Sequence, residues 1–269
     1  MSSTKNYALI TGATEGIGYE LAKLFVKDNY NLIIVARHQD ELDSRAQEFR
    51  AQGAEIITIA KDLFKREEAF AVCEEVKALG LHVSVLVNNA GQGVYGLFKD
   101  TEIERELDIV DLNIAATVIL TKHFAKDMIA RNEGKILNLA SIASKTPGPW
   151  QSVYHGTKAF VYSFSEAIRY ELKDHNITVT ALLPGATDTD FFHKADMTES
   201  KIVQDTSLAD PADVAKDGYD ALMSGDDKVI SGFKNKAMIG MANLMPDTAV
   251  AAMMDKQQKP VEGSDKSED

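Results

Sequence analysis

The sequence holds one cysteine, no long apolar run and no excess of basic residues. Because Cys73 stands alone among 269 residues, no disulfide can form within the chain and a cysteine-based metal site is disfavoured. We therefore expect no bound metal and a reducing, cytoplasmic location. No run of about 18 apolar residues occurs, and the start lacks the basic flank and apolar stretch of an export signal, so we expect no membrane span. A net charge of −12 argues against nucleic acid as a partner, because phosphate contacts need a basic face.

Short β-branched apolar runs alternate along the chain with segments of helical period. The runs are nearly continuous in apolar residues, as in strands buried on both faces, and they cover residues 7–11, 31–36, 55–60, 84–88, 135–140 and 177–183. The helical stretches are 18–27, 41–51, 66–78, 101–131 and 152–173. This rhythm predicts an α/β fold with one doubly wound, Rossmann-type parallel sheet covered by helices on both faces.

The limits of the domain come from composition and from one helix-start pattern. Thr101, Glu102, Ile103 and Glu104 form a capping-box pattern that places the start of the long fourth helix. From about Lys256 to the end the chain is charged and rich in small polar residues, which is typical of a disordered tail. We therefore expect a single domain over residues 1–255 and a polar tail over residues 256–269.

Ligands of open parallel sheets bind beyond the carboxyl ends of the strands, so the residues at those ends are the candidates for a site. After the first strand comes TGATEGIG, with Gly12, Gly16 and Gly18. Glycines there permit a tight turn and let the backbone approach a diphosphate at the amino end of the next helix. The alternative is a plain strand-to-helix turn. No Gly-Lys-Ser/Thr follows, which disfavours a nucleotide-triphosphatase loop.

The second strand ends at Arg37, where many dinucleotide-binding folds carry an acid that binds the adenosine ribose. An acid would repel a 2′-phosphate, whereas Arg37 can attract one, so the sequence favours NADP(H) over NAD(H). The alternatives are a solvated arginine at a strand end and an opposing effect of Glu15, if its carboxylate faces the phosphate.

The next two strand ends carry polar residues suited to the same ligand. Asp62, with the Leu63 amide beside it, can accept a hydrogen bond from an adenine amino group, although an Asp-Leu pair alone is more often a helix cap. After the fourth strand, residues 88–91 read Asn-Asn-Ala-Gly, and asparagines at that density usually stabilise turns. Four successive strand ends thus predict a dinucleotide site.

Three titratable residues stand close together in SVYHGTKAF, residues 152–160. Tyr154 and Lys158 are one helical turn apart and share a face, whereas His155 is rotated by about 100° and lies off it. A lysine beside a phenol favours the phenolate, so we expect a lowered pKa for Tyr154, as a general acid/base requires. Such a pair is common on surface helices, but Ser141, at the end of the fifth strand, can bind a substrate oxygen beside it.

Taken together, these motifs resemble those of the short-chain dehydrogenase/reductase family, from about residue 7 to 192. TGATEGIG resembles its TGxxxGxG loop, residues 154–158 its YxxxK pair, and Asn113 its fourth catalytic position. The resemblance implies a hydride transfer between a nicotinamide cofactor and a carbonyl/alcohol pair, with a catalytic set of Asn113, Ser141, Tyr154 and Lys158. It also implies cofactor contacts from Gly12, Thr14, Glu15, Gly16, Ile17, Gly18, Arg37, Asp62, Leu63, Asn89, Ala90, Gly91, Tyr154, Lys158, Pro184, Gly185, Thr187 and Thr189.

The resemblance assigns a role to each catalytic residue. Tyr154 exchanges the proton, Ser141 holds the substrate oxygen, and Lys158 binds the nicotinamide ribose. Asn113 anchors a water between Lys158 and solvent. Asn113 also falls on an apolar helix face, where a buried amide needs a hydrogen-bond partner. A structural hydrogen bond to the backbone would meet that need as well as the water would. A cofactor-sensing or scaffold protein without turnover is the alternative function.

Substrate and partner contacts are expected in the second half of the chain. Family members carry a mobile lid at residues 190–210, and they usually pair through their two long helices, so a homodimer or homotetramer is expected. Trp150 is either an apolar wall of the site or core packing. The methionines of residues 238–254 adapt to irregular apolar partners, such as an apolar substrate or a second subunit, or else pack in the core.

Overall fold

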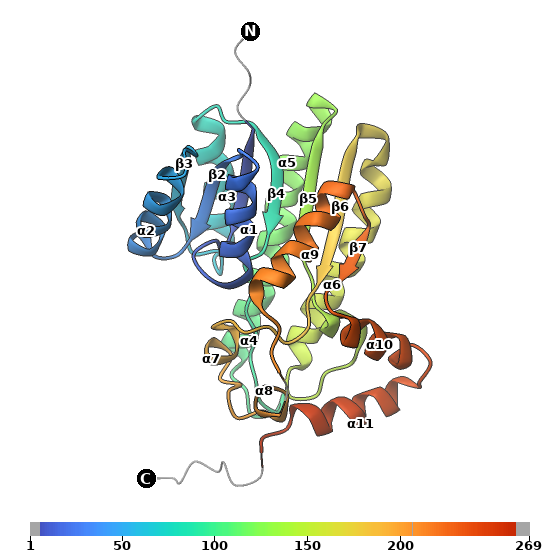
Figure 1. The fold of residues 1–269 in the computed structure, drawn as a ribbon. Helices are drawn as coiled ribbons and strands as arrows, with labels where there is room; N and C mark the ends of the chain where they lie inside the picture. The colour runs from blue at the N-terminus through green and yellow to red at the C-terminus, as the bar shows by residue number, and fades with distance from the viewer. Residues whose placement is uncertain (1–5, 206, 262–269) are drawn as a thin grey trace.

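The computed structural model describes residues 6–205 and 207–261 of the chain. Its centre is a seven-stranded parallel sheet in the order β3-β2-β1-β4-β5-β6-β7 (Figure 1). The strands are β1 (Tyr7–Thr11), β2 (Asn31–Ala36), β3 (Ile56–Ala60), β4 (Val83–Asn88), β5 (Gly134–Leu139), β6 (Ile177–Leu183) and β7 (Lys228–Ile230). The predicted doubly wound α/β fold is confirmed. The short strand β7 was not predicted, because three residues carry no readable period.

Helices cover both faces of the sheet. They are α1 (Gly16–Lys27), α2 (Gln39–Arg50), α3 (Arg66–Ala78), α4 (Ile103–Val110), α5 (Thr117–Arg131), α6 (Ser152–Leu172), α7 (Phe191–Lys194), α8 (Lys201–Gln204), α9 (Pro211–Ser224), α10 (Phe233–Ala242) and α11 (Asp247–Gln258). In β1, Ala8 and Ile10 pack with α1, α2 and α9, whereas Leu9 packs with α3 and α5. Both sets are fully buried, which is why the strand sequences are continuous in apolar residues.

The helical segment expected at residues 101–131 is interrupted. A π-helical turn, η1 (Asp111–Ala116), separates α4 from α5. The capping-box prediction is wrong: α4 begins at Ile103 after Glu102, and the Thr101 hydroxyl donates to Glu106 Oε1 at 2.9 Å instead of capping the helix. A capping threonine would accept from a backbone N–H, whereas the Thr101 hydroxyl here donates to the side chain of Glu106.

The domain extends beyond residue 255. Helix α11 continues to Gln258, which is only 2% exposed, and Pro260 forms a β-bridge with Ser200. Residues 256–261 therefore pack on the protein and are not part of a tail, because Gln258 is buried among residues distant in sequence. The remainder of the expected tail, residues 262–269, lies outside the described residues. Figure 1 shows α10 and α11 beyond the carboxyl end of the sheet, with α11 next to α8.

Candidate active site

The glycine loop follows β1 and leads into α1. Gly12 and Gly16 have φ values of +65° and +54°, which favour glycine over residues with a side chain. A Cβ on Gly18 would overlap the carbonyl oxygen of Gly12, so the helix packs directly against the loop. Asn89 holds the loop from β4, because its Nδ2 donates to the carbonyls of Thr11 and Gly12 at 2.8 and 3.0 Å. The loop is thus a preformed cradle of backbone at a helix N-terminus, which suits a diphosphate.

A pocket of about 390 Å³ runs along the carboxyl ends of the strands. It collects most of the predicted residues: Gly12, Thr14, Glu15, Gly16, Ile17, Arg37, Asp62, Leu63, Asn89, Ala90, Gly91, Ser141, Tyr154, Lys158, Pro184, Gly185, Thr187 and Thr189. Gly18 and Asn113 do not line it. Both lie behind the pocket wall, where they pack or bond to residues that do.

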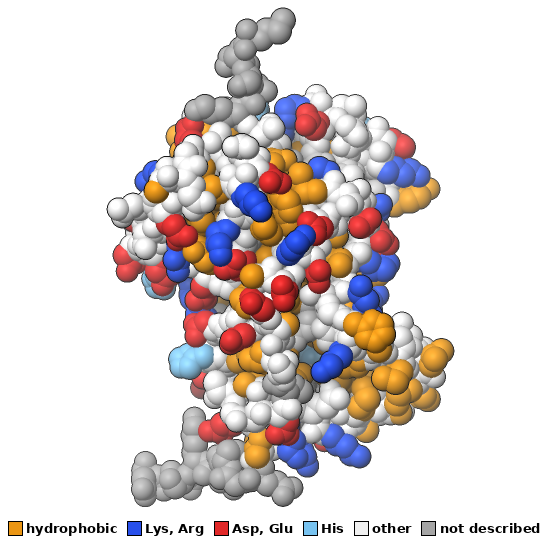
Figure 2. All heavy atoms as spheres, in the orientation of Figure 1, with side chains coloured by type: hydrophobic (Ala, Val, Ile, Leu, Met, Phe, Trp, Pro, Cys, Tyr) orange, Lys and Arg blue, Asp and Glu red, His pale blue; other side chains and the backbone are white. Residues whose placement is uncertain are grey.

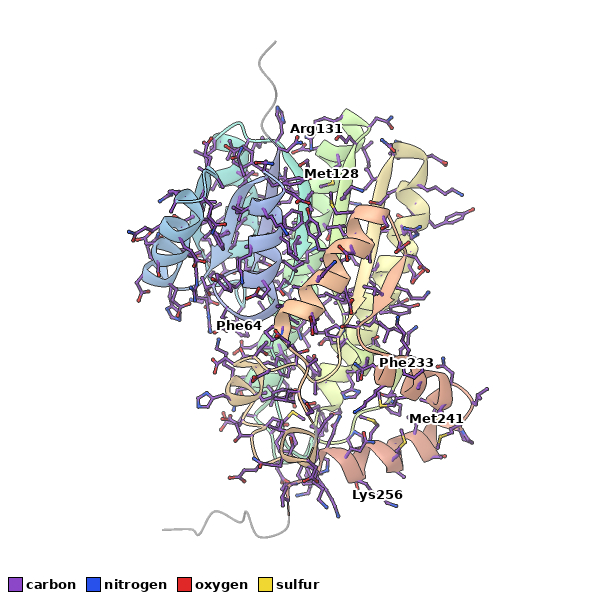
Figure 3. All side chains as sticks on the ribbon, in the orientation of Figure 1. Phe64, Met128, Arg131, Phe233, Met241 and Lys256 are labelled. Atoms are coloured by element: carbon purple, nitrogen blue, oxygen red, sulfur yellow. The ribbon has the colours of Figure 1, made fainter. Side chains whose placement is uncertain are left out.

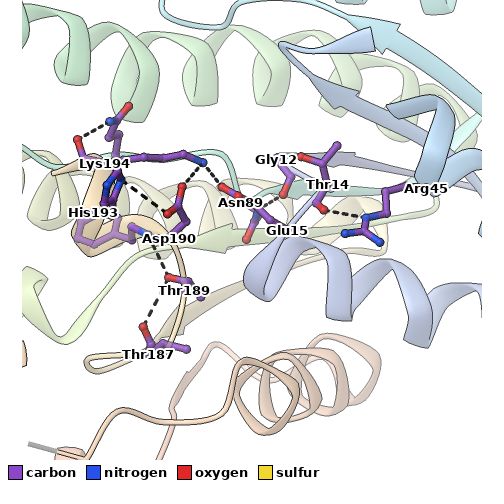
Figure 4. A network of polar contacts seen from close by, with 12 residues as sticks. Gly12, Thr14, Glu15, Arg45, Asn89, Thr187, Thr189, Asp190, His193 and Lys194 are labelled. Atoms are coloured by element: carbon purple, nitrogen blue, oxygen red, sulfur yellow. Dashed lines mark hydrogen bonds and ion pairs between the residues drawn. The ribbon is translucent and has the colours of Figure 1, made fainter. Parts of the chain in front are cut away.

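Glu15 does not stand free in the loop. Its carboxylate pairs with the ammonium of Lys194 in α7, and Asp190 Oδ2 lies 3.2 Å from the same Nζ (Figure 4). On the other side of the loop, Arg45 Nε donates to the Thr14 carbonyl at 2.9 Å. Lys194 therefore ties α7 to the glycine loop, a contact that the sequence did not reveal.

Arg37 lies at the adenosine end expected of the pocket. Its side chain is exposed and its Cζ lies 5.5 Å from the ring centroid of Phe64. Figure 3 labels Phe64 close to this end of the sheet. Asp62, which also lines the pocket, accepts a hydrogen bond from the Phe64 amide at 3.3 Å. This bond lies in the turn before α3 and does not cap the helix, whose N-cap residue is Lys65.

Ser141, Tyr154 and Lys158 meet at the centre of the pocket. Burial raises the pKa of Tyr154 to about 12, and a hydrogen bond with Ser141 opposes that rise. Burial also lowers the pKa of Lys158 to about 8. The expected lowering of the Tyr154 pKa is therefore not found in the protein alone. Lys158 Nζ lies 5.8 Å from the phenol ring centroid and donates to the Leu139 carbonyl at 2.8 Å, so burial outweighs its charge.

Asn113 lies in the π-helical turn η1, a feature that often marks functional positions. Its Nδ2 donates to the Gln92 carbonyl and to Thr157 Oγ1, both at 2.9 Å, and its Oδ1 accepts from the Gln92 amide at 3.0 Å. The hydrogen bonds with the Gln92 backbone are the structural pairing that the sequence left open as an alternative to holding a water. They also place the amide close to Lys158, since a Cβ on Gly91 would lie 3.2 Å from Asn113 Oδ1 and 3.1 Å from Lys158 Nζ.

Asn88 does not line the pocket but joins the sheet to the helices. Its Nδ2 donates to Thr121 Oγ1 in α5 at 2.9 Å and to Asn138 Oδ1 in β5 at 2.8 Å. Asn138 in turn donates to Ser165 Oγ in α6 at 2.9 Å. This buried polar ladder fixes α6, and with it Tyr154, against the strands.

The other end of the pocket is mostly apolar. Its lining there includes Phe191, Phe192, Met197, Ile202, Met238 and Met254. Trp150 is not among the lining residues; it stacks on Tyr95, with ring centroids 5.7 Å apart. The methionines differ in burial, because Met238 and Met254 line the pocket whereas Met241 is 61% exposed. Figure 3 labels Met241 and the 84% exposed Phe233 on α10, and Figure 2 shows hydrophobic side chains gathered over this part of the surface.

Several lining residues were not predicted from the sequence, among them Gln151, Lys194 and Gln258. His155 also lines the pocket, although it lies off the face that Tyr154 and Lys158 share, and its Nδ1 lies 2.8 Å from the Thr146 carbonyl. Gln258 could have been found from the sequence. It lies four residues after Met254 on one helix, so the two side chains share a helix face.

The order of the strands and the glycine loop after β1 are those of a Rossmann-type α/β protein. The pocket that holds Ser141, Tyr154 and Lys158 lies at the carboxyl edge of the sheet, where such proteins bind their ligands. The family model described as short chain dehydrogenase matches residues 6–200. The chain belongs to the short-chain dehydrogenase/reductase family and is an oxidoreductase of that family. No helix in the described ranges is long and apolar enough to cross a membrane.

Two curated relatives illustrate the similarity. An uncharacterised oxidoreductase of Bacillus subtilis is 36% identical over 182 residues, which are 68% of this chain and 68% of that protein. A very-long-chain 3-oxoacyl-CoA reductase of Laccaria bicolor is 37% identical over 180 residues, 65% of this chain. The match spans 53% of the length of that reductase, so about half of it has no counterpart here.

Solved structures agree with the fold along most of the chain. A short-chain dehydrogenase from Sphingobium yanoikuyae in complex with NADPH has a TM-score of 0.80 and 25% identity, covering 90% of this chain and 96% of that one. An alcohol dehydrogenase from Comamonas testosteroni, described as specific for bulky-bulky ketones, has a TM-score of 0.76 and 25% identity, with 90% and 93% covered. The NADPH bound to the first of these structures supports a nicotinamide cofactor.

Proposed function

We propose that this chain is an NADP(H)-dependent carbonyl reductase in which Tyr154 supplies the proton. The observation that carries the proposal is the meeting of Ser141, Tyr154 and Lys158 in the same pocket as the glycine loop. Gly12 and Gly16 provide a backbone cradle for the diphosphate, and Lys158 is placed to hold the nicotinamide ribose. A bound nicotinamide would supply the hydride.

The state of Tyr154 suits a proton donor. Since burial raises its pKa to about 12, the phenol is protonated at neutral pH and can donate to a carbonyl oxygen as negative charge develops there. Ser141 donates its one hydroxyl proton to the phenol here and would turn it to the substrate oxygen when a carbonyl is bound. The polar ladder behind α6 keeps both groups in place. Loss of the phenol should therefore remove turnover without removing the cofactor cradle.

The preference for NADP(H) rests on Arg37, an exposed cation at the edge of the pocket. Glu15, which would oppose a 2′-phosphate, is paired with Lys194, so part of its negative charge is compensated. The NADPH complex of the Sphingobium structure agrees with this choice.

The substrate we propose is a partly apolar ketone or aldehyde. The part of the pocket away from the glycine loop is lined by apolar side chains, namely Phe191, Phe192, Met197, Met238 and Met254. The names of two similar proteins agree, since one reduces very-long-chain 3-oxoacyl-CoA and another is specific for bulky-bulky ketones.

We also retain the expectations of a homodimer or homotetramer and of a cytoplasmic location. Ile103 and Leu107 on α4 are 56% and 55% exposed, and Phe160 on α6 is 40% exposed. Exposed apolar residues on the helices through which relatives usually pair suit a subunit contact. Light scattering on the purified protein checks the oligomeric state.

The test of the function is a carbonyl screen that follows the absorbance of NADPH and, separately, of NADH. The proposal expects turnover of apolar ketones or aldehydes with NADPH. Binding of NADPH without turnover of any carbonyl would instead support the cofactor-sensing alternative.

A further inference from the structure

Two buried amide side chains border the apolar end of the pocket. Gln151 and Gln258 both line it and are only 5% and 2% exposed. Within the described part of the chain, Gln151 Nε2 and Gln258 Oε1 have no hydrogen-bond partner. Buried polar atoms are usually paired, because leaving one unpaired is costly. One unpaired donor and one unpaired acceptor in the same pocket point to a ligand that pairs with both.

A chain of hydrogen bonds sets the orientation of the Gln258 amide. His155 Nδ1 lies 2.8 Å from the Thr146 carbonyl, which can only accept, so the proton of the ring is on Nδ1. His155 Nε2 is then an acceptor, and Gln258 Nε2, 3.0 Å away, donates to it. Burial lowers the pKa of His155, which keeps the ring neutral and this pattern intact. Gln258 Oε1 is thereby directed away from the ring.

The end of α11 is anchored, so the acceptor is held in place. The Tyr95 hydroxyl donates to the main-chain carbonyl of Gln258 at 2.6 Å. One turn earlier, Trp150 Nε1 donates to Asp255 Oδ1 at 3.0 Å, and Trp150 stacks on Tyr95. These contacts also explain why Trp150 lies outside the pocket: it positions the helix that closes it.

The donor, Gln151 Nε2, lies beside the proposed proton donor. A Cβ on Gly93 would be 3.2 Å from Gln151 Nε2, 3.5 Å from Tyr154 Cδ2 and 2.9 Å from Phe191 Cζ. The amide, the phenol ring and the phenyl ring therefore border the same small space. Gln151 is also one helical turn before His155, whose backbone amide donates to its carbonyl at 3.0 Å. Gln151 and Gln258 thus both line the pocket and are both hydrogen-bonded to His155, Gln151 through its main-chain carbonyl and Gln258 through the imidazole ring.

We propose that Gln151 and Gln258 recognise a hydroxyl group that the substrate carries apart from its reacting carbonyl. This inference rests on the proposed carbonyl reduction. A hydroxyl is the smallest group that accepts from Gln151 and donates to Gln258 at once. A carboxylate has no proton for Gln258 Oε1, and a methyl group leaves both amides unpaired. With Phe191 and Met254 lining the same pocket, the substrate class is an uncharged, largely apolar hydroxyketone.

The test compares ketones that differ only in this group. The probes are a straight-chain dodecanone, a set of dodecanones that carry one hydroxyl at different positions, and the keto acid of the same chain length, each assayed for kcat/KM with NADPH. At least one hydroxyketone should exceed the parent ketone by about tenfold or more, and the keto acid should fall below the parent. Gln151→Met and Gln258→Met keep the side-chain length but remove the amide. In these variants the kcat/KM of the best hydroxyketone divided by that of the parent ketone should fall to near one, whatever the absolute rate.

The control is Met254→Leu, which changes an apolar lining residue on α11 and should shift all ketones together. Equal kcat/KM for the parent and every hydroxyketone in the wild type, or an unchanged ratio in both methionine variants, overturns the inference and leaves the reductase assignment standing. No turnover of any ketone overturns both. If Gln258→Met fails to fold, Gln151→Met carries the test, because its amide has no partner to lose.

Discussion

The ammonium of Lys158 is buried, and burial disfavours its charged form. The free energy of unfolding should therefore depend on pH. The pKa of Lys158 is lowered from 10.5 to about 8 by burial. Between pH 8 and 10.5 the unfolded chain holds the lysine proton and the folded chain does not. Stability then rises with pH across this window, because the unfolded state binds more protons. Below pH 8 both states are protonated and the full cost of burying the charge is present.

Lys158→Met removes this cost, so the variant should be more stable relative to the wild type at pH 7 than at pH 10. Each pKa unit between folded and unfolded chain is worth about 1.4 kcal/mol. The interval from 10.5 to about 8 therefore corresponds to a change of about 3 kcal/mol in the difference between the two proteins. Urea unfolding at a series of pH values measures it. The constant loss of the bond to Leu139 does not alter the pH dependence.

The matched control is Lys122→Met, which replaces an exposed lysine of α5. Its stability difference from the wild type should be flat over the same pH range. A flat profile for Lys158→Met as well would refute the reasoning, since it would show that the folded chain accommodates the charge without cost.

Three further predictions follow from single contacts. Arg37→Ala should raise the KM for NADPH by about tenfold while that for NADH changes little, because a charge-assisted bond to the 2′-phosphate is lost; equal effects on both cofactors would remove the assignment. Gly18→Ala should abolish tight cofactor binding in calorimetry, since its Cβ overlaps the Gly12 carbonyl oxygen; normal affinity would show that the loop can yield. Asn138→Leu should lower the free energy of unfolding by about 2 kcal/mol or more, because Asn138 is fully buried and bonded to Ser165; unchanged stability would count against the polar ladder.

The parts of the site that depend on neighbours in sequence were predictable. Gly12 and Gly16 adopt the positive φ values that the turn containing them requires. The four-residue spacing of Tyr154 and Lys158 places both side chains on one helix face. The parallel sheet then brings every strand end to one edge. For this reason 18 of the predicted site residues line one pocket, although neighbours of theirs such as His38, Lys61 and Gln92 also line it and were not predicted.

Contacts between distant segments could not be read in the same way. Gln258 and His155 are 103 positions apart, and Lys194 and Glu15 are 179 apart, so no local pattern links them. A polar composition suggested a tail where the chain in fact packs its last helical turn. The pKa of Tyr154 was also misjudged, since helical spacing predicts the nearby lysine but not the depth of burial.

If Tyr154 is the proton donor of a carbonyl reductase, Tyr154→Phe should lose turnover but keep the cofactor. Two quantities are measured on the same protein: turnover of an apolar ketone with NADPH, and the dissociation constant of NADPH. We expect kcat to fall by about 100- to 10,000-fold while NADPH binding stays nearly unchanged. Retained turnover in Tyr154→Phe, with cofactor binding intact, would contradict this role for Tyr154.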